Sequence, residues 1–325
     1  MAAAGSTIAL PIVFRLLKRW NVVDMPKSRS SHSTPIPRGA GIALGIGVIC
    51  AWLVSGAGEL VLITGLILMC ALGAVDDFRS LPAVPRLIVQ IVISLGLVGT
   101  FLTVDSSRSD LVGVGSIAIV WLVGTVNATN FMDGINGLSA ISGVLIGGTY
   151  WILASEETSK IEWIAPAVVG ACLAFLPWNW GGRAKFFLGD SGSYLLGASL
   201  GVMGIILWLE GLPLVVAVAP MSIYWLDVAT TLVRRLLQRK QLTTAHRDHV
   251  YQRLVDYGLS HPFAALSVGT FTALVCLISL AASKGIFASL TGLLLVVTLS
   301  AVYVFLPRLL RNPNQIASTD HGSLS

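Results

Sequence analysis

Long apolar runs separated by short polar connections constrain the fold of this chain more than any other feature. Hydrophobic residues make up 55% of its 325 residues, and charged residues only 11%. A helix needs about 20 apolar residues to cross a hydrocarbon core of about 30 Å. The sequence therefore predicts an all-α, polytopic integral membrane protein with about eleven transmembrane helices. The eleven runs, several of them short, cover residues 2–17, 40–56, 59–75, 85–104, 112–128, 137–154, 162–177, 192–209, 212–231, 263–281 and 286–306.

Basic residues are distributed unevenly between the connections. If odd-numbered helices end in the cytoplasm, all but three of the 21 lysines and arginines lie on that side, the exceptions being Arg108, Lys160 and Lys284. This asymmetry follows the positive-inside rule, so the N-terminus is predicted to lie outside. The net charge of +5 then reflects topology and attraction to membrane lipid or phosphate, and it is no evidence for nucleic-acid binding. Residues 1–310 are predicted to form a single membrane domain, and 311–325 a disordered cytoplasmic tail.

Carboxylates gather at the predicted cytoplasmic ends of three different helices. Asp76 and Asp77 follow the third run in "ALGAVDDFRSLP", Asp133 follows the fifth in "NATNFMDGINGL", and Asp190 follows the seventh in "FFLGDSGSYLLG". A single Asp at a helix end is most simply a cap or a solvated terminus. Several on one face, next to glycines that let backbone approach a ligand, favour a site instead. Clustered oxygen ligands of this kind predict Mg²⁺, or Mn²⁺ in its place, on a phosphate-bearing substrate.

Positive groups accompany these acids on the same face. Arg79, Arg86, Arg183 and Lys185 flank the acidic turns, and the longest predicted cytoplasmic loop contains "TAHRDHVYQRL" over residues 244–254. That loop supplies His246, Arg247, His249 and Arg253, which suit a diphosphate held by charge-assisted hydrogen bonds. Two alternatives stay open, namely a basic loop lying on anionic lipid and, with less support, a zinc site built on the two histidines.

Asp227 differs from the other acids because it lies about two turns inside the ninth run. An ionisable residue at such a depth is a functional candidate by default. Its spacing of seven residues from Arg234 also allows a structural ion pair on one helix face. The sequence leaves both interpretations open.

Together these motifs resemble the polyprenyl-phosphate N-acetylhexosamine-1-phosphate transferases of glycosyltransferase family 4. The resemblance runs from about Asp24 to Leu254 in the order of the family. "DDFRSLP" resembles its DDxxxxP element, "NATNFMDGINGL" its NxxNxxDGxDGL element, "FFLGDSGS" its FMGDxGS element and "HRDHVYQRL" its HxxH loop. "RSSHSTPIPRGAGI" resembles the first cytoplasmic loop of the O-antigen-initiating branch.

The resemblance implies a reaction in which undecaprenyl phosphate attacks the β-phosphorus of a UDP-N-acetylhexosamine and releases UMP, which initiates O-antigen or surface-polysaccharide synthesis. It implies catalytic roles for Asp76, Asp77 and Asp133. The Mg²⁺ ligands that it implies are Asn127 and Asp190. The substrate-binding residues that it implies are Arg86, Asn130, Lys185, His246, Arg247 and His249. The expected location is the bacterial inner membrane, with the active site facing the cytoplasm, and a homodimer is left open.

Two positions depart from the family pattern. Asn136 replaces the second Asp of the DGxDG element, and Ala40 stands where the first loop has Gly. Neither position is a predicted metal ligand, but Asn136 bears on substrate specificity. The lysine-rich stretch that follows the Asp pair in muramyl-pentapeptide transferases is absent, which favours the O-antigen branch.

Three alternatives accompany this hypothesis. Within the enzyme class, the chain could be a phospho-N-acetylmuramoyl-pentapeptide transferase of cell-wall synthesis. From another class, it could be a transporter of a lipid-linked sugar or a divalent cation. Transporter sites lie near the bilayer midplane, whereas most acids here lie at helix ends. Within the reaction itself, a lipid phosphate is largely ionised near neutral pH, so direct displacement is expected ahead of a two-step path through an aspartyl-phosphate.

Overall fold

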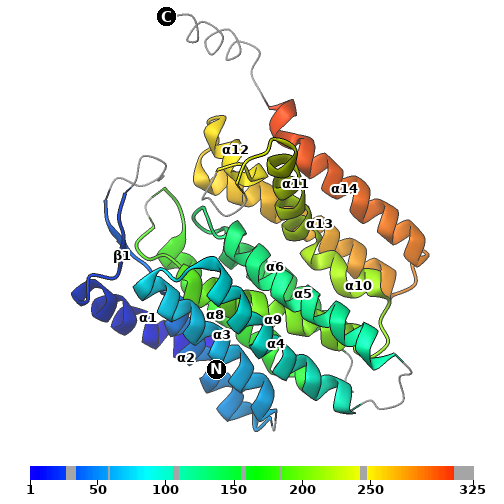
Figure 1. The fold of residues 1–325 in the computed structure, drawn as a ribbon, viewed down its shortest axis with the longest axis horizontal. Coiled ribbons are helices and arrows are strands. Elements are labelled where there is room, and N and C mark those ends of the chain that lie inside the picture. Colours follow the sequence, from blue (N-terminus) through cyan, green and yellow to red (C-terminus); the bar gives the residue numbers. More distant parts are fainter. Residues whose placement is uncertain are drawn as a thin grey trace, which may run out of the picture.

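The computed structural model of the chain describes residues 1–26, 34–57, 59–104, 110–154, 159–182, 184–241 and 247–310, and the predicted tail at 311–325 lies outside them. Most of the described residues are helical, and the helices pack side by side as an elongated bundle (Figure 1). The α-helices are α1 (Ala2–Arg19), α2 (Gly41–Ser55), α3 (Leu60–Arg79), α4 (Ala83–Val104), α5 (Leu111–Met132), α6 (Leu138–Leu153), α7 (Ser159–Glu162), α8 (Ile164–Asn179), α9 (Gly189–Leu209), α10 (Leu214–Val218), α11 (Ser222–Leu237), α12 (Val250–Asp256), α13 (His261–Ser283) and α14 (Ser289–Leu309).

Every one of the eleven predicted apolar runs contains a helix. Within the described residues, seven helical segments are long and apolar enough to cross a membrane, and three shorter apolar helices accompany them, α2, α6 and α8. The predicted all-α, polytopic membrane fold is therefore confirmed. The number of crossings and their orientation stay predictions.

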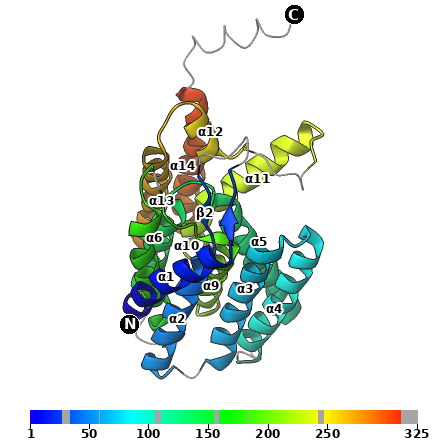
Figure 2. The ribbon, with the colours of Figure 1, turned by 90° about the vertical axis from the view of Figure 1, so that its left-hand side faces the viewer.

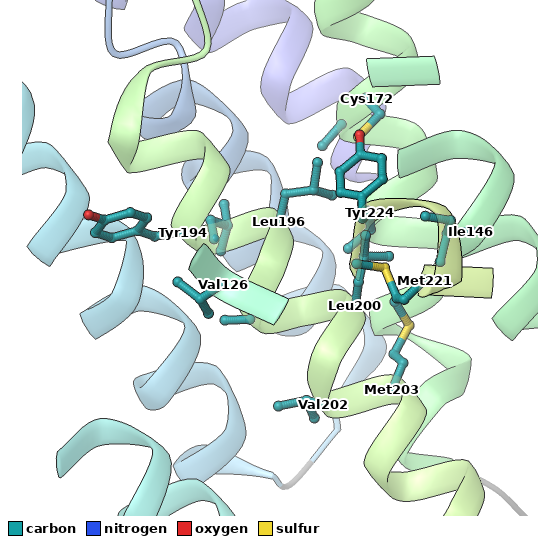
Figure 3. Close-up of a cluster of buried hydrophobic side chains, with 14 of the residues drawn as sticks. Val126, Ile146, Cys172, Tyr194, Leu196, Leu200, Val202, Met203, Met221 and Tyr224 are labelled. Carbon is teal, nitrogen blue, oxygen red and sulfur yellow. The ribbon is translucent and has the colours of Figure 1, made fainter. Parts of the chain in front are cut away.

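Helix α9 is the centre of the bundle, because 89% of its most apolar 18-residue window is buried. Its small residues let neighbouring helices approach closely. A Cβ atom on Gly41 of α2 would lie 1.9 Å from the backbone nitrogen of Gly192, and one on Gly73 of α3 would lie 2.2 Å from the carbonyl oxygen of Asp190. Figure 3 shows Met221 and Tyr224 packed on one side of α9, with Tyr194 pointing towards the opposite side. The start of α9 is thus held between α2 and α3, with no room for a side chain at either crossing.

The ninth predicted span is divided in the structure. It consists of α10, a 3-10 turn η1 (Ala219–Met221) that contains Pro220, and α11. Proline cannot donate the backbone hydrogen bond that a continuous helix needs, which explains the break. Figure 2 shows α11 leaning outwards from the other helices beyond this turn. Asp227 therefore lies in a separate helix that begins at Ser222.

The first connection predicted to be cytoplasmic, between α1 and α2, is joined to the start of α9. Two short strands, β1 (Val23–Asp24) and β2 (Ile36–Pro37), pair antiparallel. Arg38, directly after β2, forms a parallel bridge with Phe187, just before α9. The sequence pattern alone predicts only an extended loop here, whereas in the structure this loop brings Arg38 close to the start of α9. Residues 27–33, between the two strands, lie outside the described ranges.

Candidate functional site

Four helix ends bring their polar side chains to one place. These are the last turn of α3, the first turns of α4, the last turn of α5 and the first turn of α9. The sequence predicts that Asp76, Asp77, Asp133 and Asp190 converge. The contacts described below join Asp76, Asp77 and Asp190 with Arg86 and Asn130 into one cluster. We call it the acidic cluster.

Asp77 is bonded to the backbone at the start of α9. Its Oδ1 accepts the N–H of Asp190 at 2.9 Å, and its Oδ2 accepts the N–H of Ser191 at 3.0 Å. Arg38 adds charge, with Nε 3.6 Å from Oδ1 and Nη2 donating to the Asp77 carbonyl oxygen at 2.7 Å. The side chain is only 1% exposed. Both carboxylate oxygens of Asp77 accept free N–H groups at the start of α9. Asp77 therefore positions Asp190 in this geometry. The sequence pattern does not show which acid of the Asp76–Asp77 pair has this role.

Asp76 faces the other way, into the cluster. Its Oδ2 is 2.6 Å from Nη1 of Arg86 and accepts the Tyr194 hydroxyl at 3.2 Å. Its Oδ1 accepts the N–H of Leu81 at 2.7 Å. The carboxylate is buried, whereas the side chain of Arg86 is 27% exposed. Asp76 thus holds a guanidinium at the edge of the cluster, where an incoming anion can reach it.

Asp190 lies opposite Asp76 at the start of α9. Its Oδ1 accepts the amide of Asn130 at 2.6 Å, and the same amide donates to Ser193 Oγ at 3.0 Å. Asp190 and Asp76 are linked through α9, because Tyr194, one turn after Asp190 on that helix, donates its hydroxyl to Asp76. Acids gathered in one cluster favour the binding of a cation, because like charges repel.

Asn127 is one helical turn deeper than Asn130. Its Nδ2 donates to Oε1 of Gln90 at 2.7 Å and to the carbonyl oxygen of Val123 at 2.8 Å. Because both N–H bonds of the amide are used, Oδ1 is the atom that Asn127 has left for a ligand. Gln90 is fully buried and lies one turn after Arg86 on α4. No described contact joins Asn127 directly to Asp190, so its role as a metal ligand stays a prediction.

Asp133 completes the predicted set of acids just after α5. The Ser139 hydroxyl donates to its Oδ1 at 2.6 Å. The pKa of Asp133 is raised to about 8, mainly by burial and also by the negative charges of Asp190 and Asp77, and the Ser139 hydrogen bond opposes this shift. The negative charge of the acidic cluster thus affects the pKa of Asp133. With a pKa of about 8, its carboxyl group is mostly protonated at neutral pH.

This raised pKa predicts a pH-dependent stability difference. The folded state favours the protonated form of Asp133. The contribution of this group to the free energy of unfolding is therefore fully present below the pKa of an Asp in the unfolded chain, and it is lost as pH rises through about 8. Asp133→Asn keeps an acceptor for Ser139 and cannot ionise. We expect thermal unfolding of the two purified proteins to show the wild type losing stability relative to the variant across this window. A difference that is independent of pH would contradict the assignment.

The donors of the cluster fit a hard divalent cation shared with a substrate. Mg²⁺ binds through one or two carboxylates and leaves its other positions to water and substrate phosphates. Asp190 provides a carboxylate, Asp76 a second one in the same cluster, and Asn127 an amide oxygen. No group of three or more His, Cys, Asp or Glu side chains that could hold a metal occurs among the described residues. The oxygen donors of Asp190, Asp76 and Asn127 are of the type that Mg²⁺ prefers, and Mg²⁺ binding stays a prediction.

The described part of the basic loop, from Arg247 onwards, contacts α11. Nδ1 of His249 lies 3.0 Å from Oδ1 of Asp227, and both side chains are buried. Arg247 pairs with Asp256 at 2.9 Å. Asp227 therefore faces the basic loop, and its described partners do not include Arg234.

Several predicted residues lie outside the described contacts of the cluster. Lys185 is exposed, and its backbone N–H donates to the Trp178 carbonyl oxygen at 2.8 Å. His246 and Arg183 lie outside the described residues. The roles predicted for these three in substrate binding or charge balance stay predictions.

Both departures from the family pattern have a local explanation. The Nδ2 group of Asn136 donates to the Gly181 carbonyl oxygen at 2.7 Å, a bond that a carboxylate could not make. Asn136 thus links the connection after α5 to the one after α8. Ala40 has φ −57° and ψ −22°, an ordinary helical conformation that does not require glycine.

Three polar residues of the cluster were not predicted as site residues. Arg38 contacts Asp77, Gln90 contacts Asn127, and Tyr194 contacts Asp76. Gln90 could have been noticed as a lone amide within an apolar run, four residues after Arg86. Tyr194, four residues after Asp190, shares its helix face. Arg38 lies in "RSSHSTPIPRGAGI", and the resemblance of this stretch to the first loop of the family could have singled it out.

Comparisons with known proteins agree with this geometry. The family model described as glycosyl transferase family 4 matches residues 60–208, which include all four acids of the predicted site. A probable undecaprenyl-phosphate N-acetylglucosaminyl 1-phosphate transferase of Bacillus subtilis (strain 168) is 30% identical over 277 residues, covering 80% of this chain and 77% of that protein. A decaprenyl-phosphate N-acetylglucosaminephosphotransferase of Mycolicibacterium smegmatis is 29% identical, with 97% of this chain and 90% of that protein covered.

A more distant group matches over a shorter stretch. A phospho-N-acetylmuramoyl-pentapeptide-transferase of Enterococcus faecalis is 42% identical over 97 residues, which is 30% of this chain and 30% of that protein. The matches that cover most of the chain are thus to N-acetylglucosamine-phosphate transferases. With the acidic cluster assembled from the same motifs, the chain belongs to the polyprenyl-phosphate N-acetylhexosamine-1-phosphate transferases of glycosyl transferase family 4.

Proposed function

We propose that this protein transfers an N-acetylhexosamine 1-phosphate from a UDP-sugar to undecaprenyl phosphate, with release of UMP, and so initiates a lipid-linked surface polysaccharide such as O-antigen. The observation that carries the proposal is the meeting of Asp76, Arg86, Asn130 and Asp190 at four helix ends. Carboxylates and a guanidinium at one membrane depth suit a diphosphate and its metal. The names of the relatives that cover most of the chain favour N-acetylglucosamine as the sugar.

The proposed reaction is a direct displacement at phosphorus. An oxygen of the lipid phosphate forms a bond to the β-phosphorus of the donor, and the bond from that phosphorus to the bridging oxygen breaks, so that UMP leaves with the electron pair. Arg86, held by Asp76, stabilises the negative charge that develops on the phosphoryl oxygens. Mg²⁺, when bound by Asp190 with Asp76 and Asn127, would supply further charge neutralisation. We assign to Asp133 and to the basic loop the role of positioning the UDP-sugar.

The geometry favours direct displacement over an aspartyl-phosphate intermediate. Both oxygens of Asp77 accept backbone N–H bonds, and Asp76 is paired with Arg86, so neither carboxylate is free to attack phosphorus without breaking these contacts. The acids lie at helix ends, which also favours an enzyme over a transporter. We place the site on the cytoplasmic face of the bacterial inner membrane, because the predicted excess of basic residues lies on that side.

The test is a transfer assay with purified protein. Radiolabelled UDP-N-acetylglucosamine, other UDP-N-acetylhexosamines and UDP-N-acetylmuramoyl-pentapeptide are each supplied with undecaprenyl phosphate, with Mg²⁺ or with EDTA. We expect labelled lipid and UMP in equal amounts from an N-acetylhexosamine donor, only with Mg²⁺. Transfer from the muramoyl-pentapeptide donor alone would establish the cell-wall alternative. Label on the protein when lipid is omitted would contradict direct displacement.

A further inference from the structure

A buried amide of α4 lies one helical turn away from the acidic cluster. Gln90 is fully buried and follows Arg86 by four residues, so both side chains lie on one face of α4. Its Oε1 accepts a hydrogen bond from Nδ2 of Asn127 on α5 at 2.7 Å. Asn127 in turn precedes Asn130 by three residues and shares its face of α5. The contact between the two amides is therefore one turn from two residues of the cluster, Arg86 and Asn130.

One backbone carbonyl group determines how both amides are oriented. Nδ2 of Asn127 also donates to the carbonyl oxygen of Val123 at 2.8 Å. A carbonyl oxygen can only accept, so the nitrogen of the Asn127 amide, and not its oxygen, must face it. Gln90 must then present its own oxygen to the second N–H of that nitrogen. The two bonds occupy Nδ2 and leave Oδ1 as the Asn127 atom that can bind a metal.

The nitrogen of the Gln90 amide indicates that packing alone does not explain this residue. Its Nε2 is buried and has no hydrogen-bond partner among the described residues. An unpaired N–H group in the interior costs free energy, and an apolar side chain of similar length would avoid that cost. The described hydrogen bond that Gln90 does make is the one to Asn127. A role for Gln90 is therefore to be sought in what it does to the Asn127 amide.

We propose that Gln90 is a positioning residue that holds the Asn127 amide with Oδ1 free for the divalent cation. Without Gln90, the amide keeps only its bond to Val123 in its own helix, and other side-chain rotamers become accessible to it. A residue that holds a metal ligand by a hydrogen bond affects metal affinity without touching the metal. The inference rests on the proposed function, in which Asn127 and Asp190 are ligands of Mg²⁺.

The alternative is that Gln90 only ties α4 to α5. Gln90→Met separates the two roles, because methionine has a similar length and no amide. The substitution removes the unpaired Nε2 and leaves one N–H of Asn127 unpaired, so we expect little change in melting temperature. A structural tie predicts the opposite pattern, namely a lower melting temperature and an unchanged metal affinity.

Ser94→Ala is the matched control on the same helix face. Ser94 lies one turn after Gln90, it is fully buried, and its Oγ has no hydrogen-bond partner among the described residues. The control therefore also removes a buried unpaired polar group from α4, but one that does not contact Asn127. We expect it to change neither the melting temperature by much nor the metal affinity.

The first measurement is the binding of Mn²⁺ alone to the purified protein in detergent, followed by electron paramagnetic resonance. Asp190→Asn gives the binding at other places, which is subtracted. We expect Gln90→Met to weaken the remaining binding by about 10- to 100-fold, and Ser94→Ala to bind as the wild type does. Equal affinities of Gln90→Met and the wild type would overturn the proposal. Equal losses in Gln90→Met and Ser94→Ala would overturn it as well.

The second measurement is a double-mutant cycle with Asn127→Ala. In that background Gln90→Met should have little further effect on manganese affinity, because it acts through the Asn127 amide. Losses that add in full would show that Gln90 acts apart from Asn127 and would overturn the proposal. If Asn127→Ala binds no manganese, the first measurement decides alone.

These measurements need no turnover, so their outcome is separate from that of the transfer assay. A wild type that binds manganese but transfers no sugar would refute the proposed function, while the affinity of Gln90→Met still decides the positioning role. Normal transfer with equal manganese affinities would refute the positioning role alone. A wild type whose binding equals that of Asp190→Asn would refute both the cation site and this inference.

Discussion

Asp190→Asn is expected to abolish UMP release, with a loss of at least about 100-fold in kcat. The substitution removes the negative charge that faces Asp76 at the start of α9. It keeps an oxygen that can accept the Asn130 amide, and the backbone N–H of residue 190 still bonds to Asp77. The fold should therefore be retained while the affinity for the divalent cation is lost. Coupled detection of UMP, with undecaprenyl phosphate and UDP-N-acetylglucosamine, measures the effect.

A matched control uses the same change at the opposite end of the bundle. Asp110 begins α5, where its Oδ1 accepts the N–H of Gly113 at 2.8 Å. Asparagine caps a helix about as well as aspartate. Asp110→Asn should therefore release UMP at nearly the wild-type rate. If Asp190→Asn retained most of the activity while Asp110→Asn did not, the acidic cluster would not be the catalytic site.

Gly73→Ala is expected to prevent normal packing of α3 on α9, with a loss of about 3 kcal/mol or more in stability. A Cβ atom at residue 73 would lie 2.2 Å from the carbonyl oxygen of Asp190 and 2.5 Å from the nitrogen of Ser191. Backbone on both sides cannot move aside as a flexible side chain can. Gly73 lies one turn before Asp77, so the displacement also disturbs the bonds from Asp77 to α9. Thermal unfolding in detergent and the transfer assay should both show the loss.

Gly96→Ala on α4 is the matched comparison. A Cβ atom at Gly96 meets nothing within 4 Å, and the residue lies inside a helix as Gly73 does. Alanine is the better helix former, by up to about 1 kcal/mol. We therefore expect unchanged or slightly raised stability and full activity. Equal tolerance of alanine at both positions would contradict the close crossing of α3 and α9.

The helices and the convergence of the acids could be predicted because both signals are local in the sequence. Each apolar run is long enough to be recognised alone, and each acid follows directly after one. Ends of antiparallel spans on one side of a membrane must meet at one depth, so Asp76 and Asp190 could be placed together before the packing was known. The break at Pro220 within the ninth span was not predicted, because a proline in an apolar run does not always divide a helix, as Pro177 in α8 and Pro307 in α14 show.

The roles of individual residues could not be predicted, because they depend on partners far away in the chain. Asp76 and Asp77 are adjacent, but successive residues on a helix point about 100° apart. One therefore meets Arg86 and the other meets α9 and Arg38. The sequence allowed an ion pair between Asp227 and Arg234, because a spacing of seven residues places both on one face of a helix. The described partners of Asp227 instead include His249 and Val250, because the chain after α11 folds back over the helix.

The location of the divalent cation tests the central claim most directly. Anomalous X-ray diffraction from crystals grown with Mn²⁺ and UDP-N-acetylglucosamine would show the metal independently of any assay. We predict a manganese peak within coordination distance of an Asp190 carboxylate oxygen, shared with the diphosphate and beside Asp76. Manganese and donor bound together at any place away from the ends of α3, α5 and α9 would contradict the account.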